Sequence, residues 1–229
     1  MQVDLNADVA ESPDDLVLLD VVTSANVCCG AYAGGVDLMV EACARAVERG
    51  VAIGAQVGYA DPEGFGRRPQ EPDDEELVES VQQQIDLLAE IADAAGGHVA
   101  YVKPHGALYN TIVADERQAR AVVEAVAPYG LPLLGLPGAA SLRIASAEGL
   151  PVVTEGFADR AYRPDGTLVP RSEPGAVHAE VATAVAQALR LASQVDSLCV
   201  HGDTPAALEL TRAVRAELEE TGYALQAFA

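Results

Sequence analysis

The chain has 229 residues, of which 50% are hydrophobic, and its 35 acidic against 14 basic residues give a formal net charge of −21. This length and composition suit one domain with a large buried core, spanning residues 1–229. The negative charge disfavours nucleic acid and anionic membrane as partners. No run approaches the roughly 20 apolar residues of a membrane-spanning helix, and no signal-peptide pattern opens the chain, so we expect a cytoplasmic protein.

Short apolar runs alternate with amphipathic segments from one end of the chain to the other. The apolar runs predict buried strands at residues 3–5, 21–27, 51–55, 99–103, 131–134, 151–154, 197–201 and 224–228. Helical spacing of apolar residues predicts helices at residues 36–49, 73–95, 115–127, 139–147 and 175–192, and another from residue 204. Asp73 and Glu76 form a predicted capping box, and Thr204 with Pro205 would be the N-cap and first turn of the last helix.

The regular alternation of strand and helix predicts parallel strands joined by right-handed crossovers. An open nucleotide-binding sheet would want a glycine-rich turn after its first strand, whereas residues 6–11 are acidic and contain no glycine. A barrel instead gathers polar residues from the C-terminal ends of many strands. We therefore predict a distorted seven- or eight-stranded parallel βα barrel.

Polar residues follow most of the predicted strands, and in a barrel they would converge on one mouth. In chain order they are Asn6, Asp8, Glu11, Ser24, Asn26, Gln56, Tyr59, Asp61, Arg67, Arg68, Lys103, His105, Asp159, Arg160, His201 and Asp203.

The segment around Lys103 carries the strongest chemical signal. Lys103 is the single lysine in the chain, which suggests a need for a compact, tunable ammonium; chance in an arginine-rich composition is the alternative. His105 can exchange a proton near neutral pH, or it is a structural histidine. Asp8 and Glu11 are close enough in sequence to shift each other's pKa, which suits a general base, although solvated loop carboxylates look the same.

The remaining candidates also allow two interpretations. Arg67 and Arg68 can clamp a carboxylate or phosphate, or they neutralise the acidic run at residues 71–76. His201 and Asp203 form a polar pair at a strand end, or Asp203 merely leads into a helix cap. Cys199 with His201 resembles half of a metal site, but without a second Cys/His pair we expect the cysteines to be buried structural thiols.

Together these residues resemble the signatures of the LamB/YcsF family of lactam-utilisation proteins, in family order and over nearly the whole chain. The matching segments are Asp4-Leu5-Asn6-x-Asp8-x-x-Glu11, Ser24-Ala25-Asn26-Val27-x-Cys29-Gly30, Gly64-Phe65-Gly66-Arg67-Arg68, Val102-Lys103-Pro104-His105-Gly106-Ala107-Leu108-Tyr109-Asn110, Phe157-Ala158-Asp159-Arg160-x-Tyr162, Asp165-Gly166-x-Leu168-Val169-Pro170-Arg171 and Val200-His201-Gly202-Asp203.

The resemblance implies a barrel of the glycoside hydrolase and polysaccharide deacetylase type. It also implies the opening of 5-oxoproline to glutamate by an ATP-hydrolysing complex with two further subunits, B and C. We expect ATP to be bound by those partners, because this chain has no Walker-type phosphate loop.

The residue types and the implied reaction suggest roles. We expect Asp8 or Glu11 to activate water, Lys103 to stabilise developing negative charge, and His105 to protonate the departing ring nitrogen. Substrate-binding candidates are Asn6, Asn26, Arg67, Arg68, Asp159, Arg160, His201 and Asp203.

The chain departs from the family's pattern in its first third. Tyr32 and Gln56 stand where the family has histidines, and Ala10 replaces a glycine. Neither Tyr32 nor Gln56 is a good ligand for a divalent metal, so we expect no bound metal. Two alternatives stay open: a metal-dependent deacetylase-like hydrolase, which these losses disfavour, and a divergent non-catalytic binding subunit, which they favour.

Overall fold

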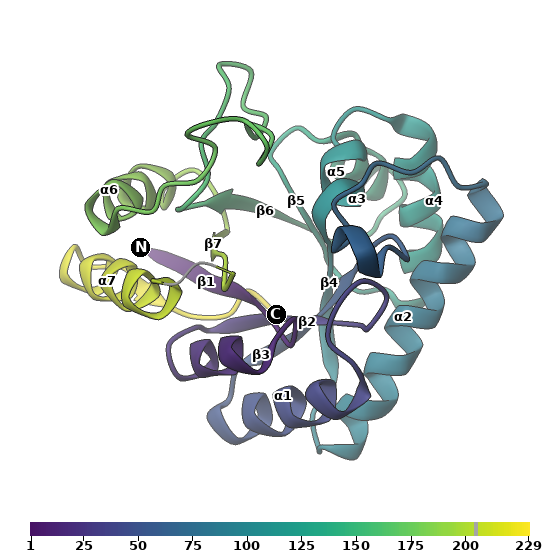
Figure 1. The fold of residues 1–229 in the computed structure, drawn as a ribbon, viewed down its shortest axis with the longest axis horizontal. Coiled ribbons are helices and arrows are strands. Elements are labelled where there is room, and N and C mark those ends of the chain that lie inside the picture. The colour runs from purple at the N-terminus through teal and green to yellow at the C-terminus, as the bar shows by residue number, and fades with distance from the viewer. Residues whose placement is uncertain (204–205) are drawn as a thin grey trace.

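The computed structural model describes residues 1–203 and 206–229, and it forms a closed parallel β-barrel with helices around its outside (Figure 1). The barrel strands, all paired in parallel, are β1 (Gln2–Val9), β2 (Ser24–Cys28), β3 (Ala52–Val57), β4 (Val99–Pro104), β5 (Leu133–Gly135), β6 (Val152–Phe157) and β7 (Ser197–Val200). Strand β1 closes the barrel because it pairs with both β2 and β7. The predicted barrel is confirmed, with seven strands in the ring.

The eighth predicted strand lies outside the ring. Strand β8 (Ala224–Leu225) pairs only with the first residues of β1. The helices are α1 (Val36–Arg49), α2 (Asp74–Ala94), α3 (Gly106–Thr111), α4 (Glu116–Val126), α5 (Ala140–Ala147), α6 (Val181–Leu191) and α7 (Ala207–Glu220), with 3-10 helices η1 (Pro13–Asp20), η2 (Pro62–Gly64) and η3 (Ala127–Tyr129). In the part of the chain that the structure describes, none of the helices combines the length and apolar character that crossing a membrane requires.

Some predicted boundaries were wrong. Helix α6 begins at Val181 rather than at residue 175, because Val177 is paired with Arg160 in an antiparallel bridge. Asp73 is the N-cap of α2, but its side chain makes no capping hydrogen bond, so the predicted capping box does not form. The prediction for Thr204 and Pro205 lies outside the described residues. The short helix α3 was not predicted, because its six residues are too few to show a helical period.

The interior of the barrel is polar as well as apolar, and β1 shows why. Successive side chains of a strand point to opposite faces, so Asp4, Asn6 and Asp8 share one face of β1. All three are buried, and their side chains bond to residues of β2, β4 and β7, which identifies this face as the barrel interior. The expectation that Asn6 and Asp8 follow the strand in a loop was therefore wrong, because interior partners let β1 continue to Val9.

A glycine in β3 makes room for one of these interior contacts. A methyl group on Gly54 would lie 2.2 Å from ring carbons of Tyr101 in β4. The Tyr101 hydroxyl donates to Asn26 Oδ1 at 2.7 Å, and its ring packs edge-on against Phe228 with 4.9 Å between centroids. Because Gly54 has no side chain, the Tyr101 ring can occupy the space beside it.

We expect Gly54→Ala to lower the free energy of unfolding by about 1–3 kcal/mol, because the added methyl group must displace the Tyr101 ring. Chemical denaturation measures the change. In a Tyr101→Leu background the same substitution should cost less, since the obstructing ring is gone. Equal costs in the two backgrounds would show that Gly54 is not required by Tyr101.

Candidate active site

Lys103 lies inside the barrel between two carboxylates and is only 2% exposed. Its Nζ is 3.1 Å from Asp8 Oδ1 and 2.8 Å from Glu155 Oε1. Burial alone would lower the pKa of Lys103, but the neighbouring negative groups, Asp8 foremost, raise it well above its usual value. Lys103 is therefore charged, and the expectation of a lysine at a solvated mouth was wrong, because its counter-ions lie within the barrel.

Asp8 is the ionised carboxylate of the site. Its Oδ1 accepts from Lys103 Nζ and, at 2.9 Å, from the amide of Asn26. Burial would raise the pKa of Asp8, but the charge of Lys103 holds it below its usual value. The same Asn26 amide donates to Asn6 Oδ1 at 2.7 Å, so both predicted asparagines lie beneath Asp8 and hold it in place.

His105 is buried and neutral at physiological pH. Its ring stacks on Tyr32 with 4.0 Å between centroids, Nε2 lies 3.2 Å from the carbonyl oxygen of Phe65, and Nδ1 lies 3.1 Å from Gln56 Nε2. These partners fit the tautomer in which Nε2–H donates to Phe65 and Nδ1 accepts from Gln56. Burial lowers the pKa of His105 to about 4. A neutral ring with this tautomer does not favour the predicted role of His105 as proton donor.

The Glu11 carboxyl group is protonated at physiological pH, whereas the neighbouring His105 ring is neutral. Its Oε1 lies 3.3 Å from His105 Nδ1 and has no hydrogen-bond partner among the described residues. Burial, together with the nearby charge of Asp8, raises the pKa of Glu11 to about 9. Two carboxyl groups with opposite pKa shifts therefore face the same atom, His105 Nδ1, and such a pair can serve as a base and an acid.

The turn after β1 places Glu11 beside His105. The Asp15 carboxylate accepts hydrogen bonds from the backbone N–H groups of Ala10, Glu11 and Ser12, at 2.8, 3.0 and 2.8 Å. Ala10 adopts φ 61°, a left-handed conformation that glycine adopts more readily. This geometry explains structurally why glycine would suit the position where the sequence has Ala10.

A cavity of about 640 Å³ lies over these groups at the C-terminal ends of the strands. Six of the predicted site residues line it: Asp8, Arg67, Lys103, His105, Arg160 and His201. The other lining residues are Pro69, Pro104, Gly106, Ala107, Tyr109, Asn110, Thr111, Phe157, Leu168, Pro170, Arg171 and Ser172. The volume falls within the usual range for a small-molecule site.

The comparisons with known proteins agree with this geometry. The model of the LamB/YcsF family matches residues 3–229. The chain belongs to the LamB/YcsF family. A protein of Streptomyces avermitilis, named as the A subunit of 5-oxoprolinase, is 51% identical, over 99% of this LamB/YcsF chain and 100% of the relative. A Mycobacterium avium protein of the same name is 48% identical, over 99% and 98% of the two chains.

Solved structures show the same fold. The lactam utilization protein from Thermus thermophilus superposes with a TM-score of 0.92 at 39% identity, covering 100% of both chains. A family 4 carbohydrate esterase from Streptomyces lividans gives a TM-score of 0.58 at 13% identity, covering 100% of this chain and 93% of the esterase. At that identity the likeness extends to the fold alone, and it confirms the deacetylase-type barrel.

The remaining predicted residues of this LamB/YcsF protein divide into supporting residues and one outlier. Asp159 Oδ1 lies 2.9 Å from His201 Nδ1, and Asp203 pairs with Arg67 at 2.6 Å. Arg68 is not brought to the cavity, because its guanidinium pairs with Asp61 and Glu63. Nor do Arg67 and Arg68 neutralise the acidic run at residues 71–76, where Arg117 pairs with Glu71 and Asp74 instead.

The sequence interpretation missed three cavity or interior groups. Arg171 lines the cavity and pairs with Asp203 at 2.9 Å, and it appeared in the sequence only within a family signature. Tyr109 also lines the cavity, and its buried hydroxyl has no hydrogen-bond partner among the described residues. Glu155, the second counter-ion of Lys103, is fully buried in β6, where only a glutamate within an otherwise buried strand could have signalled it.

The described residues include one set of side chains that resembles a metal site. One ligand atom each from Asp8, Glu11 and His105 lies within 4.8 Å of the other two. However, the ammonium of Lys103 is 3.1 Å from Asp8, and the amide nitrogen of Gln56 faces His105 Nδ1 at 3.1 Å. Both are hydrogen-bond donors where a cation would require lone pairs, so this set does not fit a divalent metal.

We expect Glu11→Gln to flatten the dependence of stability on pH. Folding raises the pKa of Glu11 from its usual 4.5 to about 9, so the folded state keeps a proton that the unfolded state has released. Stability from this group is complete below pH 4.5 and is lost as pH rises towards 9. The wild type should therefore lose about 1.4 kcal/mol more per pH unit than the variant between about pH 5 and about pH 8.

Denaturant titrations at several pH values measure this difference. Glu75→Gln is the matched control, because Glu75 is exposed on α2 and should leave the profile unchanged. Parallel profiles for the wild type and Glu11→Gln would contradict the protonated state of Glu11.

Proposed function

We propose that this chain is the A subunit of an ATP-dependent 5-oxoprolinase, which opens 5-oxo-L-proline to L-glutamate together with subunits B and C. The relatives that carry the corresponding name align over nearly the whole chain. The observation that carries the proposal is the pair of carboxyl groups with opposite pKa shifts, Asp8 and Glu11, whose oxygens lie 3.9 and 3.3 Å from the same atom, His105 Nδ1. Hydrolysis of an amide requires both a proton acceptor and a proton donor.

A lactam amide is stabilised by resonance, so its carbonyl must be activated before water can add. We propose that ATP is bound by the partner subunits, where it supplies a phosphoryl group to the lactam oxygen. The acidic residues that follow in sequence after β1 argue against a phosphate cradle at that turn, which agrees with ATP being held elsewhere.

The residues of this chain would then carry out the ring opening. Asp8 Oδ2, which lies 3.9 Å from His105 Nδ1, accepts a proton from the attacking water as the new C–O bond forms. Glu11, the protonated carboxyl group, supplies the proton that the ring nitrogen takes up as the C–N bond breaks, and the neutral His105 ring, 3.3 Å away, orients it. Lys103 stabilises the ionised form of Asp8, and a second water releases phosphate from the opened product.

The second candidate is a metal-dependent deacetylase-like hydrolase, and its one support is that ligand atoms of Asp8, Glu11 and His105 lie within 4.8 Å of one another. We expect elemental analysis of protein purified without chelators to find no stoichiometric transition metal, because donors of Lys103 and Gln56 already face these ligands. Stoichiometric zinc, or activity removed by chelation and restored by metal, would favour the second candidate.

The main proposal is tested in the complex reconstituted from its three kinds of subunit, by ATP-dependent release of glutamate. Asp8→Asn should reduce turnover by about 100-fold or more, because an amide cannot accept the proton. Asp93→Asn, at an exposed position of α2, is the matched control. Full turnover by a folded Asp8→Asn variant would remove Asp8 from the mechanism.

Lys103→Met should lower the free energy of unfolding by about 3–5 kcal/mol, because Asp8 and Glu155 would both be buried without their counter-ion. Adding Glu155→Gln should restore part of that stability without restoring turnover. Activity is therefore compared in this double variant, at a temperature where thermal unfolding shows that it is folded. Wild-type turnover there would exclude a catalytic role for the ammonium.

A further inference from the structure

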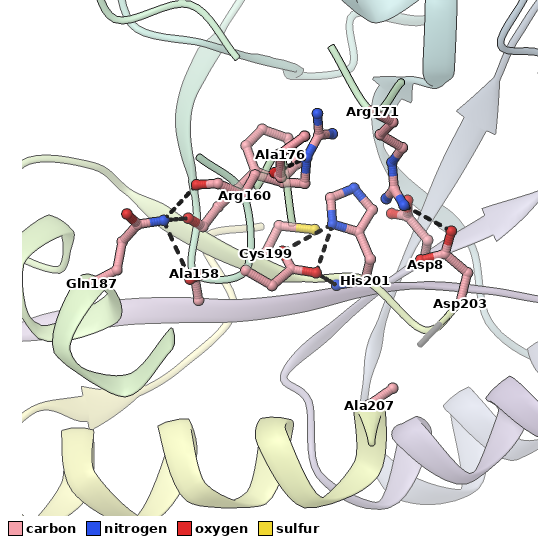
Figure 2. A network of polar contacts seen from close by, with 12 residues as sticks. Asp8, Ala158, Arg160, Arg171, Ala176, Gln187, Cys199, His201, Asp203 and Ala207 are labelled. Carbon is pink, nitrogen blue, oxygen red and sulfur yellow. Dashed lines mark hydrogen bonds and ion pairs between the residues drawn. The ribbon is translucent and has the colours of Figure 1, made fainter. Parts of the chain in front are cut away.

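The long connection between β6 and α6, residues 158–180, forms one wall of the cavity and is named here the mouth segment. It contributes Arg160, Leu168, Pro170, Arg171 and Ser172 to the lining. Gln187 of α6 anchors its start, since Nε2 donates to the carbonyl oxygens of Phe157, Ala158 and Arg160 at 2.7, 3.2 and 2.7 Å (Figure 2). The segment is therefore held in a defined position over the site.

Three arginines line this mouth, and two of them share a single carboxylate. Arg67 Nη2 lies 2.6 Å and Arg171 Nη1 lies 2.9 Å from the same atom, Asp203 Oδ2, and Figure 2 shows the Arg171–Asp203 pair. Arg160 is only 4% exposed and donates to two backbone carbonyl oxygens, those of Ala176 at 3.2 Å and Val169 at 2.6 Å. Within residues 1–203 and 206–229, no carboxylate lies within ion-pair distance of Arg160.

The floor and the mouth of the cavity therefore differ in charge. At its floor, Lys103 faces two carboxylates, Asp8 and Glu155, so no positive charge is left over there. At its mouth, the three guanidinium groups of Arg67, Arg160 and Arg171 face the carboxylates of Asp203 and Asp159, so one positive charge is left over, in a chain whose net charge is −21. Burial, followed by the repulsion of Arg171, lowers the pKa of Arg160 to about 10, as expected where cations lack counter-ions.

We propose that Arg160, Arg171 and Arg67 form an oxyanion-binding subsite, and that it takes the phosphoryl group of a phosphorylated substrate. This inference rests on the proposed function, which places a phosphoryl group on the lactam oxygen. Guanidinium groups match the oxygens of phosphate and carboxylate through pairs of parallel N–H donors. A phosphoryl group presents three terminal oxygens to the three guanidinium groups, whereas a carboxylate presents only two. The Asp203 carboxylate pairs with Arg67 and Arg171, so it competes with an oxyanion for these two guanidinium groups.

Isothermal titration of the full chain with inorganic phosphate at fixed ionic strength tests the subsite. Arg171→Gln should weaken phosphate binding by about 10-fold or more, because it removes charge-assisted hydrogen bonds. Arg163→Gln is the matched control, since Arg163 belongs to the same segment, pairs with Glu173 and does not line the cavity. Asp203→Asn should strengthen binding several-fold, because it removes the competing carboxylate.

A second titration, with 5-oxoproline, separates the two oxyanions, and phosphate should bind more tightly. Equal phosphate affinity in the wild type, Arg171→Gln and Asp203→Asn would overturn the inference, as would 5-oxoproline binding that depends on Arg171 while phosphate binding does not. Thermal unfolding checks that each variant is folded, and the opposite effects of the two substitutions distinguish a subsite from general damage.

Turnover of the reconstituted complex keeps the two proposals apart. Phosphate binding that depends on Arg171, in a complex unable to open 5-oxoproline, would contradict the proposed function but leave the subsite standing. Ring opening at the wild-type rate by Arg171→Gln would contradict the subsite alone.

Discussion

One buried ammonium between two buried carboxylates constrains the rest of this barrel. Lys103 from β4 meets Asp8 from β1 and Glu155 from β6, so strands that are not neighbours in the ring are joined across its interior. Removing charges from water is expensive, and the cost is recovered only when partners and hydrogen bonds are all in place. The side-chain amides of Asn6 and Asn26 supply part of those hydrogen bonds, by donating to Glu155 and Asp8. The registers of these strands are therefore set by charge as well as by apolar packing.

The same constraint organises the chemistry. Because Lys103 keeps Asp8 ionised, the negative charge of Asp8 in turn favours a protonated Glu11, and burial keeps the adjacent His105 neutral. The protonation states of Asp8 and Glu11 thus depend on the buried charge of Lys103. The arginines at the mouth act separately, since Arg67 and Arg171 pair with Asp203 rather than with the carboxylates at the floor.

The sequence predicted the fold class well because buried parallel strands are short apolar runs, and most runs here were clear. It placed the ends of β1 wrongly, because Asp4, Asn6 and Asp8 resemble a polar loop until their partners are known. Those partners, such as Ser197 for Asn6, are far away in sequence, and spacing along the chain carries no trace of them.

The sequence predicted which residues form the site better than it predicted how they are arranged. Lys103 was recognisable as the single lysine, but its counter-ion Glu155 was not, since a lone glutamate in a strand usually faces solvent. Arg67 and Arg68 looked equivalent, yet only Arg67 reaches the cavity while Arg68 turns to Asp61. Arg171 lies in an irregular segment, where no periodicity predicts which way a side chain points.

The closure of the barrel through β1 has a consequence for biosynthesis. Strand β1 (Gln2–Val9) leaves the ribosome before the other strands of the ring, but its neighbour β7 (Ser197–Val200) is the last strand of the ring to be made. Until then, one edge of β1 has no partner. Barrel closure is therefore late and non-local. Non-local strand pairing forms slowly and leaves strand edges unpaired in the meantime. One edge of β1 therefore stays unpaired in the nascent chain while strands β2 to β6 are synthesised.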